Sequence, residues 1–449
     1  MKNVLLGAAS VLALSIAAPA LAQSTSTVTQ SNIGNLATVD QVGSLTGALS
    51  TVTQSGASNS ADVTQQDDNS GANPVNVSDV NQSGNSNAAT VLQNASTFAL
   101  QNNSAVDQSG NGNTADVTQL DDGQSSSVVQ SSDDNSALVQ QGDAVAALSD
   151  TSWGNDSTIN QAGSGGHIAE VSQTERFNSS TIDQTGDADG AFVAQSGQSN
   201  ASAILQTGTN DQAFVTQSGN ANGSDIVQDG ENVLATVIQS GNANDSSVDQ
   251  TSPGGVRPIN SSVFVNQSGD NNLSDVMQRA NQGYAEVLQG GTNSDATILN
   301  YGNRSVAYVH QLSGDDNSAS ITQRAEDSDA FIQQTGSRNL ASIDQQEDSP
   351  PTENFSALVI QSGDDNESSV VQDGDNSLAV NLQTGDFNNS TISQTGSSHY
   401  AGVGQYGDNN TSFVTQSGSS NYALVQQFTN GNLSTVTQSG SGNAATVSQ

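Results

Sequence analysis

The side chains best suited to acid–base chemistry near neutral pH are three histidines, and the sequence pairs none of them with a nucleophile. His167 and His399 occupy a repeat slot that is usually Asn, and His310 directly precedes Gln311 at an outward slot. We interpret them as substitutions within a side-chain ladder or as exposed residues. The chain has no cysteine, so disulfides and thiolate metal sites are excluded. The sequence therefore predicts no enzyme and no cofactor.

Paired aspartates are the second group that could do chemistry. The pairs are Asp67-Asp68, Asp121-Asp122 and Asp364-Asp365. Two carboxylates act as acid and base only where a cleft fixes their separation. These pairs fall between the periodic segments described below, so we expect solvated carboxylates in bends. Calcium could bind weakly there, but the Gly-Gly-x-Gly-x-Asp repeat of calcium β-rolls is absent from the sequence.

The first residues predict export. Lys2 precedes an apolar run from Val4 to Ala17, and Ala20-Leu21-Ala22 supplies small residues for cleavage. This order is typical of a secretory signal peptide, which we assign to residues 1–22. No later stretch is apolar and long enough to cross a bilayer. We expect an exported protein whose residues 23–449 form a single repeat domain, without insertion into a membrane.

Charge and composition indicate which classes of partner the chain is not expected to bind. The net charge is −38, with 45 acidic residues. Nucleic acids and anionic membranes require clustered positive charge, so neither is an expected partner. Few residues are aromatic, and polar residues dominate, which by itself would favour a disordered low-complexity chain. The periodicity of the sequence argues against disorder.

Glutamine recurs every 11 residues over most of the chain. Thirty-six segments, each ending at such a position, run from Gln30 to Gln449, and 27 of the 35 intervals are 11 residues. Asn300 is the one anchor that is not Gln. Two residues before the anchor, 35 of 36 segments carry Val or Ile, with Asn381 as the exception. Alternation of this kind places one set of side chains on one face of a β-strand, and the following Gly, Asn and Asp predict a tight bend.

Four residues before the anchor, the sequence alternates between two residue types. One set of 18 segments carries Ala in 17 cases, and the other carries Ser in 15. If each coil contains two strands, Ala stacks on Ala and Ser stacks on Ser. We therefore predict an all-β fold, a β-solenoid of about 18 coils with two strands per coil and a 22-residue repeat. The interior is thin, so stacked Gln and Asn side chains must hydrogen-bond from coil to coil.

The stacking prediction names particular residues. We expect repeat stacking by Gln228, Gln239, Gln250, Gln416, Gln427, Gln438 and Gln449. Uncapped solenoid ends expose strand edges, and the periodic segments reach from Ser24 to Gln449. We therefore expect an end-to-end interface made by Ser24, Ser26, Val28, Gln30, Val436, Gln438, Val447 and Gln449.

The repeat resembles that of the curlin family, the subunits of bacterial curli fibres. The matching residues are Gln438, Gly440, Asn443, Ala445 and Gln449, in the order Gln-x-Gly-x-x-Asn-x-Ala-x-x-x-Gln. The resemblance implies an extracellular or cell-surface amyloid fibre of a biofilm matrix, formed by self-polymerisation. It also implies two partners, a nucleating minor subunit and an outer-membrane secretion pore. Whether the chain is a major or a minor subunit stays open, and a monomeric secreted adhesin or matrix protein is the alternative.

Overall fold

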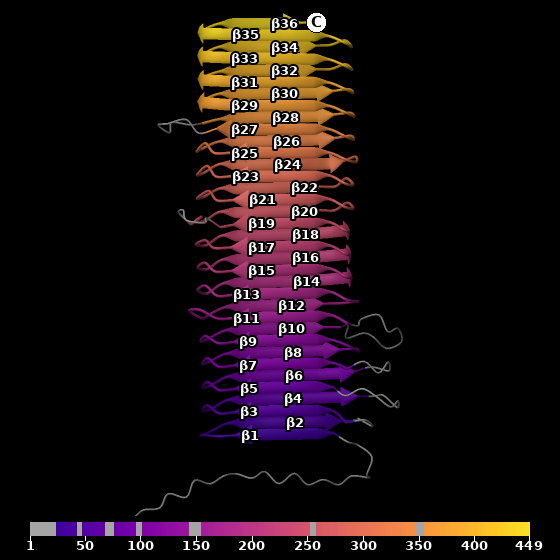
Figure 1. Cartoon of the computed structure of the whole chain (residues 1–449), viewed down its shortest axis with the longest axis vertical. Helices are drawn as coiled ribbons and strands as arrows, with labels where there is room; N and C mark the ends of the chain where they lie inside the picture. Colours follow the sequence, from indigo (N-terminus) through magenta and orange to yellow (C-terminus); the bar gives the residue numbers. More distant parts are fainter. Residues whose placement is uncertain are drawn as a thin grey trace, which may run out of the picture.

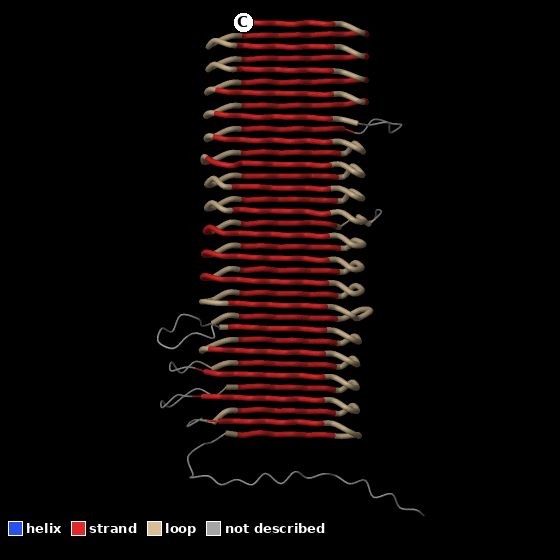
Figure 2. The backbone as a smooth tube through the Cα atoms, turned by 180° about the vertical axis from the view of Figure 1, so that it is seen from behind, coloured by secondary structure: helices blue, strands red, loops and turns tan. Residues whose placement is uncertain are grey.

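The computed structural model describes residues 24–42, 47–67, 76–95, 101–142, 154–251, 257–346 and 354–449. These residues form a tall β-solenoid, and none of them is helical (Figures 1 and 2). The predicted signal peptide, Trp153, and Pro74, Pro253, Pro350 and Pro351 lie outside the described residues.

In the described ranges, 36 strands alternate between two parallel sheets of 18 strands each. The odd sheet contains β1 (Thr25–Gln30), β3 (Leu49–Gln54), β5 (Val77–Gln82), β7 (Asn103–Gln108), β9 (Ser125–Gln130), β11 (Asp156–Gln161), β13 (Ser179–Gln184), β15 (Ala201–Gln206), β17 (Gly223–Gln228), β19 (Asp245–Gln250), β21 (Leu273–Gln278), β23 (Asp295–Asn300), β25 (Ser318–Gln323), β27 (Leu340–Gln346), β29 (Glu367–Asp375), β31 (Asn389–Ser397), β33 (Thr411–Ser419) and β35 (Leu433–Ser441). The even sheet contains β2 (Leu36–Val42), β4 (Ser60–Asp67), β6 (Ala88–Ala95), β8 (Thr114–Leu120), β10 (Ser136–Gln141), β12 (Ile168–Gln173), β14 (Gly190–Gln198), β16 (Gln212–Asn220), β18 (Leu234–Asn242), β20 (Ser262–Gln267), β22 (Tyr284–Gln289), β24 (Val306–Ser313), β26 (Asp329–Thr335), β28 (Ser356–Ser362), β30 (Leu378–Thr384), β32 (Tyr400–Gln405), β34 (Tyr422–Gln427) and β36 (Ala444–Ser448).

Each strand pairs with the strand two places along the chain, in the predicted register. In the even sheet, Ala213 pairs with Ala235 and Val215 with Val237. In the odd sheet, Ser224 pairs with Ser246. The prediction of a solenoid with two strands per coil and a 22-residue repeat is confirmed.

The core is a narrow layer between the two sheets. It contains the column of Val and Ile residues from both sheets, together with the Ala column of the even sheet. Both kinds of residue are almost wholly buried, as in Val237 and Ala235. β-branched side chains pack well on a pleated surface, which explains why Val and Ile occupy this slot. Asn381 interrupts the column and forms a hydrogen bond with the Ser368 hydroxyl across the interior.

The bends lie on two edges of the solenoid. We call the bends that follow odd strands the odd-strand edge, on the left in Figure 1, and those that follow even strands the even-strand edge, on the right. Glycines in the bends permit close stacking, because a Cβ atom on Gly241 would overlap the carbonyl of Gly269 in the next coil.

Candidate functional site: the stacking columns

A buried glutamine amide joins each coil to the next. Gln195 donates from Nε2 to Oε1 of Gln217 at 2.8 Å, and Gln217 donates to Gln239 in the same way at 2.8 Å. The Nε2 group of Gln195 also donates to the backbone carbonyl of Ser179, in the odd sheet, at 2.9 Å. One amide therefore connects two coils and both sheets. Because these groups are excluded from water, leaving one unpaired would destabilise the coil.

The ladder at the even-strand edge is continuous. Each glutamine donates to the next one from Gln41 to Gln449. Gln239, Gln427 and Gln449, which the sequence nominated for stacking, lie in this ladder. All the donors point the same way along the chain, so the ladder has a direction.

The ladder at the odd-strand edge is interrupted once. Gln228 donates to Gln250, and Gln416 donates to Gln438, each at 2.8 Å. Between these segments, Gln278 makes no side-chain hydrogen bond, and Oδ1 of Asn300 and Oε1 of Gln323 have no partner. Asparagine is one methylene shorter than glutamine, so Asn300 does not reach its neighbours. The Gln278 amide instead fills the space where Gly283 has no side chain.

A second column, at the residue before each strand, closes the bends. Asn222 donates from Nδ2 to the carbonyl of Gly241 at 2.9 Å, and its Oδ1 accepts from the backbone N–H of Asn244 at 3.1 Å. Both partners lie in the bend of the next coil, and Nδ2 of Asn222 also donates to Oδ1 of Asn200 in the preceding coil at 3.1 Å. The asparagine thus binds the bends on either side of its own. This column is nearly all Asn ahead of the odd strands but varied ahead of the even strands, from His167 to His399.

The two buried histidines reproduce two of the asparagine hydrogen bonds, the one donated within their own bend and the one accepted from the next coil. In His167, Nε2 donates to the carbonyl of Ala162 at 2.7 Å, and Nδ1 accepts from the N–H of Asp189 at 3.2 Å. His399 has the same two kinds of partner, Thr395 and Asn421. Burial lowers the pKa of His167, which keeps the imidazole neutral. The interpretation of both histidines as ladder substitutes is confirmed.

Two buried aspartates follow His167 in the same column. Asp189 accepts from the N–H of Asp211 at 3.0 Å, and Asp211 accepts from the N–H groups of Gly230 and Val233, both at 3.1 Å. Burial raises the pKa of Asp189 to about 7 and that of Asp211 to about 6. The backbone N–H groups favour the ionised carboxylates, but the cost of burying the charge outweighs them and favours the protonated form.

Two sequence interpretations need correction. Asp121 and Asp122 were expected to be solvated, yet both are buried in the bend that follows β8, at the even-strand edge. His310 was expected at an exposed outward slot, but it is half-buried on the outside of the even sheet. There its Nε2 lies 2.9 Å from Oε1 of Glu286, and its ring meets the edges of Tyr308 and Phe331.

The residues nominated for an end interface lie on the first and last coils. On β1, Val28 is 46% exposed, whereas Val52, which pairs with it from β3, is fully buried. Ser24, Ser26 and Gln30 lie on the same open side. On the last coil, Val436 and Gln438 belong to β35, and Val447 and Gln449 lie on or directly after β36. These two sets stand at opposite ends of the described solenoid (Figure 1).

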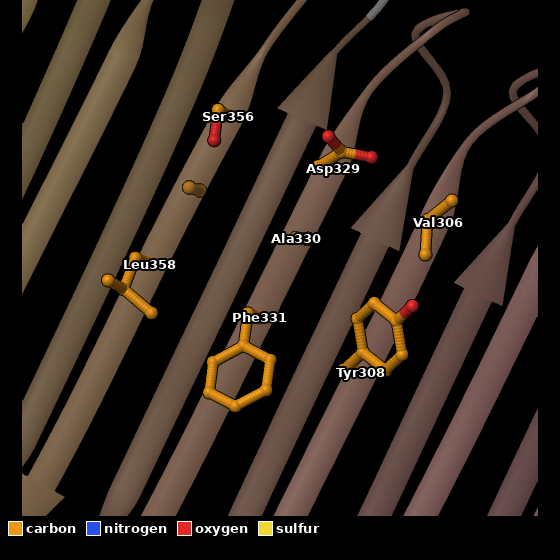
Figure 3. A pocket seen from close by; sticks show the side chains of 8 residues that line it. Val306, Tyr308, Asp329, Ala330, Phe331, Ser356 and Leu358 are labelled. Carbon is orange, nitrogen blue, oxygen red and sulfur yellow. The ribbon is translucent and has the colours of Figure 1, made fainter.

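Sequence reasoning missed an aromatic column on the outside of the even sheet. Figure 3 shows Tyr308, Phe331 and Leu358 side by side on β24, β26 and β28, where they line a shallow groove. The signal was available, because these residues all stand three positions before a glutamine anchor. A comparison of the residue types at the outward positions of the two sheets would have revealed the aromatic column.

Metal-binding clusters and membrane helices are not found in the part of the chain that the structure describes. Within it, no three His, Asp or Glu side chains gather where they could hold a metal ion. The described ranges also contain no helix long and apolar enough to span a membrane.

The family model of the curlin associated repeat matches five segments of the chain, of which the last four overlap. They are residues 291–324, 374–407, 385–418, 407–440 and 418–449. The last four begin 11 or 22 residues apart, which are the lengths of one strand with its bend and of one coil. No curated protein matches the chain. The resemblance to the curlin repeat is confirmed in these segments, and the same coil continues back to β1.

Proposed function

We propose that this chain, a β-solenoid carrying curlin associated repeats, is a structural subunit that joins end to end into extracellular curli-like fibres. Such a role requires no catalysis and no cofactor. The observation that carries the proposal is the match between the strand edges of the first and last described coils.

The two end coils present the same residues in the same order. β1 reads TSTVTQ, and the first six residues of β35 read LSTVTQ. Stacking the first coil of one copy on the last coil of another would place Ser26 on Ser434 and Val28 on Val436. On the even side, Val39 would lie on Val447. Each pair repeats a contact found between coils inside the solenoid, so the joint requires no new kind of packing.

The direction of the glutamine ladders makes the two ends complementary. At the last coil, Gln438 donates only to the carbonyl of Tyr422 and Gln449 only to that of Leu433, which leaves one N–H of each amide available. At the first coil, Gln30 and Gln41 donate to the coil above. Their Oε1 atoms have no donor within the described residues. Donors at one end and acceptors at the other favour head-to-tail stacking, a non-closing contact that generates filaments.

The sequence and the repeat support a proposal for the physiological setting. A signal peptide at residues 1–22 would deliver the chain to export, and curlin repeats are consistent with a cell-surface fibre for adhesion and biofilm matrix. A secretion pore and a nucleating subunit are the partners we expect. The charge of −38 opposes association of copies, so assembly should accelerate with salt or as pH falls toward the pI of about 4.1.

The test replaces the inward residues of the last coil. In the end-blocked variant, Val436, Gln438, Val447 and Gln449 are all changed to Lys, which places unpaired charge in the joint at a cost of several kcal/mol. The other coils should fold, because solenoid stability is roughly a sum of neighbour terms. We expect normal β-structure by circular dichroism and no fibres by electron microscopy.

The matched control changes the outward residues Thr415 and Thr437 to Lys. It should form fibres at the wild-type rate. Equal elongation by the end-blocked variant and this control would show that copies do not join through their last coils. Wild-type protein that stays monomeric at high concentration would instead support the secreted adhesin.

A further inference from the structure

The outer surfaces of the two sheets differ in chemistry. In the even sheet from β14 to β34, the slot three residues before the glutamine carries an aromatic or aliphatic side chain in eight of eleven strands, with Thr236, Glu286 and Gly402 as the exceptions. The aromatic and aliphatic residues are Phe192, Phe214, Phe264, Tyr308, Phe331, Leu358, Val380 and Leu424. In the odd sheet, the same slot carries mostly Ser, Thr and Asp, such as Ser342 and Ser369. We call the outer surface of the even sheet from β14 to β34 the aromatic face.

The aromatic face is ordered by stacking between coils. The rings of Phe192 and Phe214 stack with centroids 4.9 Å apart, and those of Tyr308 and Phe331 are 6.0 Å apart. Farther along, Tyr400 stacks on Tyr422 at 4.9 Å. These rings are half-buried, and on β24, β26 and β28 Tyr308, Phe331 and Leu358 form a continuous apolar patch (Figure 3).

The aromatic face is also depleted of charge. The 11 even strands from β14 to β34 contain two acidic residues, Glu286 and Asp329, whereas the 11 odd strands from β13 to β33 contain ten. Glu286 is held by hydrogen bonds from His310 and from the hydroxyl of Tyr284. A second copy of this acidic chain therefore meets the least repulsion here.

The size of the face suits a stable dimer. Eleven strands spaced by ~4.8 Å and six residues rising by ~3.3 Å each cover roughly 1,000 Å² on one copy. A standard protein interface buries about 800 Å² on each partner. Two sheets pack face to face at a separation of about 10 Å, and identical strand spacing on both copies lets the columns interdigitate.

We propose that the aromatic face is a lateral interface that binds the aromatic face of a second copy of this chain. The occupant is a copy because low charge, flatness and regular spacing all favour a partner with the same surface. The pairing is separate from the end-to-end joint, since the two use different residues. In a fibre it would hold two filaments side by side.

The experiment uses the full chain with the end-blocked substitutions, so that filament growth does not obscure pairing. Phe331→Asp with Leu358→Asp adds two charges to the aromatic face, and Ser342→Asp with Ser369→Asp adds two at the same slot of the odd sheet. Sedimentation equilibrium measures the dimer. We expect the second variant to dimerise like its parent and the first to dimerise at least about 10-fold more weakly.

A second pair of substitutions distinguishes the loss of contacts between two copies from the loss of the fold. Phe331→Thr with Leu358→Thr introduces a residue type that the odd sheet already carries there, so the fold should persist by circular dichroism. We expect this variant to weaken the dimer as well. A monomeric parent at high concentration, or equal dimerisation by the parent and both aromatic-face variants, would overturn the interface. Without the end-blocked substitutions, the aromatic-face variants should form filaments that do not pair side by side. If the proposed end-to-end assembly is wrong, no filaments should form at all.

Discussion

The two edges of the solenoid follow the same repeat but tolerate different changes. At the even-strand edge, the glutamine ladder is continuous and the slot before each strand is nearly always Asn. At the odd-strand edge, Asn300 interrupts the ladder, and the slot before the strands holds residues as different as His167, Asp189, Val233 and Phe355. The interrupted glutamine ladder and the varied residues before the strands therefore occur on the same edge. At the other edge, an unbroken glutamine ladder connects the coils.

The difference shows which column the fold depends on. A glutamine amide is the link between successive coils and also pairs a strand carbonyl of the opposite sheet. The side chain in the asparagine slot binds neighbouring bends. Successive bends also hydrogen-bond directly through their backbones, since the N–H of Asn232 donates to the carbonyl of Thr209. A smaller residue can partly replace Asn there, since Ser305 donates to the carbonyl of Ala325 at 2.8 Å. The glutamine column thus carries the stacking, and the asparagine column adds to it.

Breaking the continuous ladder should have the largest effect. Gln239→Leu keeps the volume but removes the acceptor of Gln217, the donor to Gln267 and the donor to the carbonyl of Gly223. Leaving these buried groups unpaired should lower the free energy of unfolding by about 3–5 kcal/mol. Urea denaturation of the end-blocked protein measures the loss, and hydrogen exchange should localise it to β16, β18 and β20.

The matched change in the other column is Asn222→Ser, in a slot that is Ser at position 294. It should cost about 1 kcal/mol, because serine keeps part of the hydrogen bonding. If it destabilises as much as Gln239→Leu, the two columns contribute equally and the distinction between them is wrong.

The buried aspartates of the odd-strand edge predict a pH dependence. The pKa values of Asp189 and Asp211 are raised from 3.8 to about 7 and about 6, so the fold binds protons more tightly than the unfolded chain does. Their stabilising contribution is fully present below pH 3.8 and is lost as pH rises through 6 and 7. His167, with its lowered pKa, acts in the opposite sense below pH 6.5.

Replacing both aspartates with Asn restores the residue of the even-strand edge. At pH 8, the double variant should be more stable than wild type by about 2–4 kcal/mol. At pH 4, the difference should largely vanish. Urea denaturation across this range tests the linkage, and a constant difference between the two proteins at all pH values would contradict it.

Repairing the interrupted ladder should stabilise the solenoid. Asn300→Gln supplies the missing methylene, so that the amide can accept from Gln278 and donate to Gln323, both of which now have unpaired atoms. We expect a gain of about 1–3 kcal/mol. The control is Asn381→Gln, which lengthens a buried Asn outside the ladder and should not stabilise. No gain from Asn300→Gln would show that the strand position, and not side-chain length, causes the interruption.

The fold was predictable because one sequence period determines its geometry. The 11-residue step and the alternation of residues such as Ala213 and Ser224 were enough to predict two strands per coil, and the structure has that register. The local consequences were harder to predict. The displacement of Gln278 depends on space left by Gly283, and the bend that contains the buried Asp121 and Asp122 accepts a hydrogen bond from Asn102 of the preceding coil. These side-chain positions are decided by contacts between coils. The sequence period identifies which residues stack on one another, but it does not give their side-chain conformations.

The smallest expected effect concerns the inner Ser column of the odd sheet. The hydroxyl of Ser180 is buried and has no hydrogen-bond partner, and the same column contains Ala319 and Ala341. Ser180→Ala should therefore change the free energy of unfolding by no more than about 0.5 kcal/mol, or stabilise slightly, since burying an unpaired hydroxyl is unfavourable. The reverse change in the even sheet, Ala213→Ser, should cost about 1 kcal/mol for the same reason. Urea denaturation of both variants compares the two columns. If Ser180→Ala were clearly destabilising, the serines would form a hydrogen-bonded ladder of their own, and the odd sheet would hold its coils together through more than its interrupted glutamines.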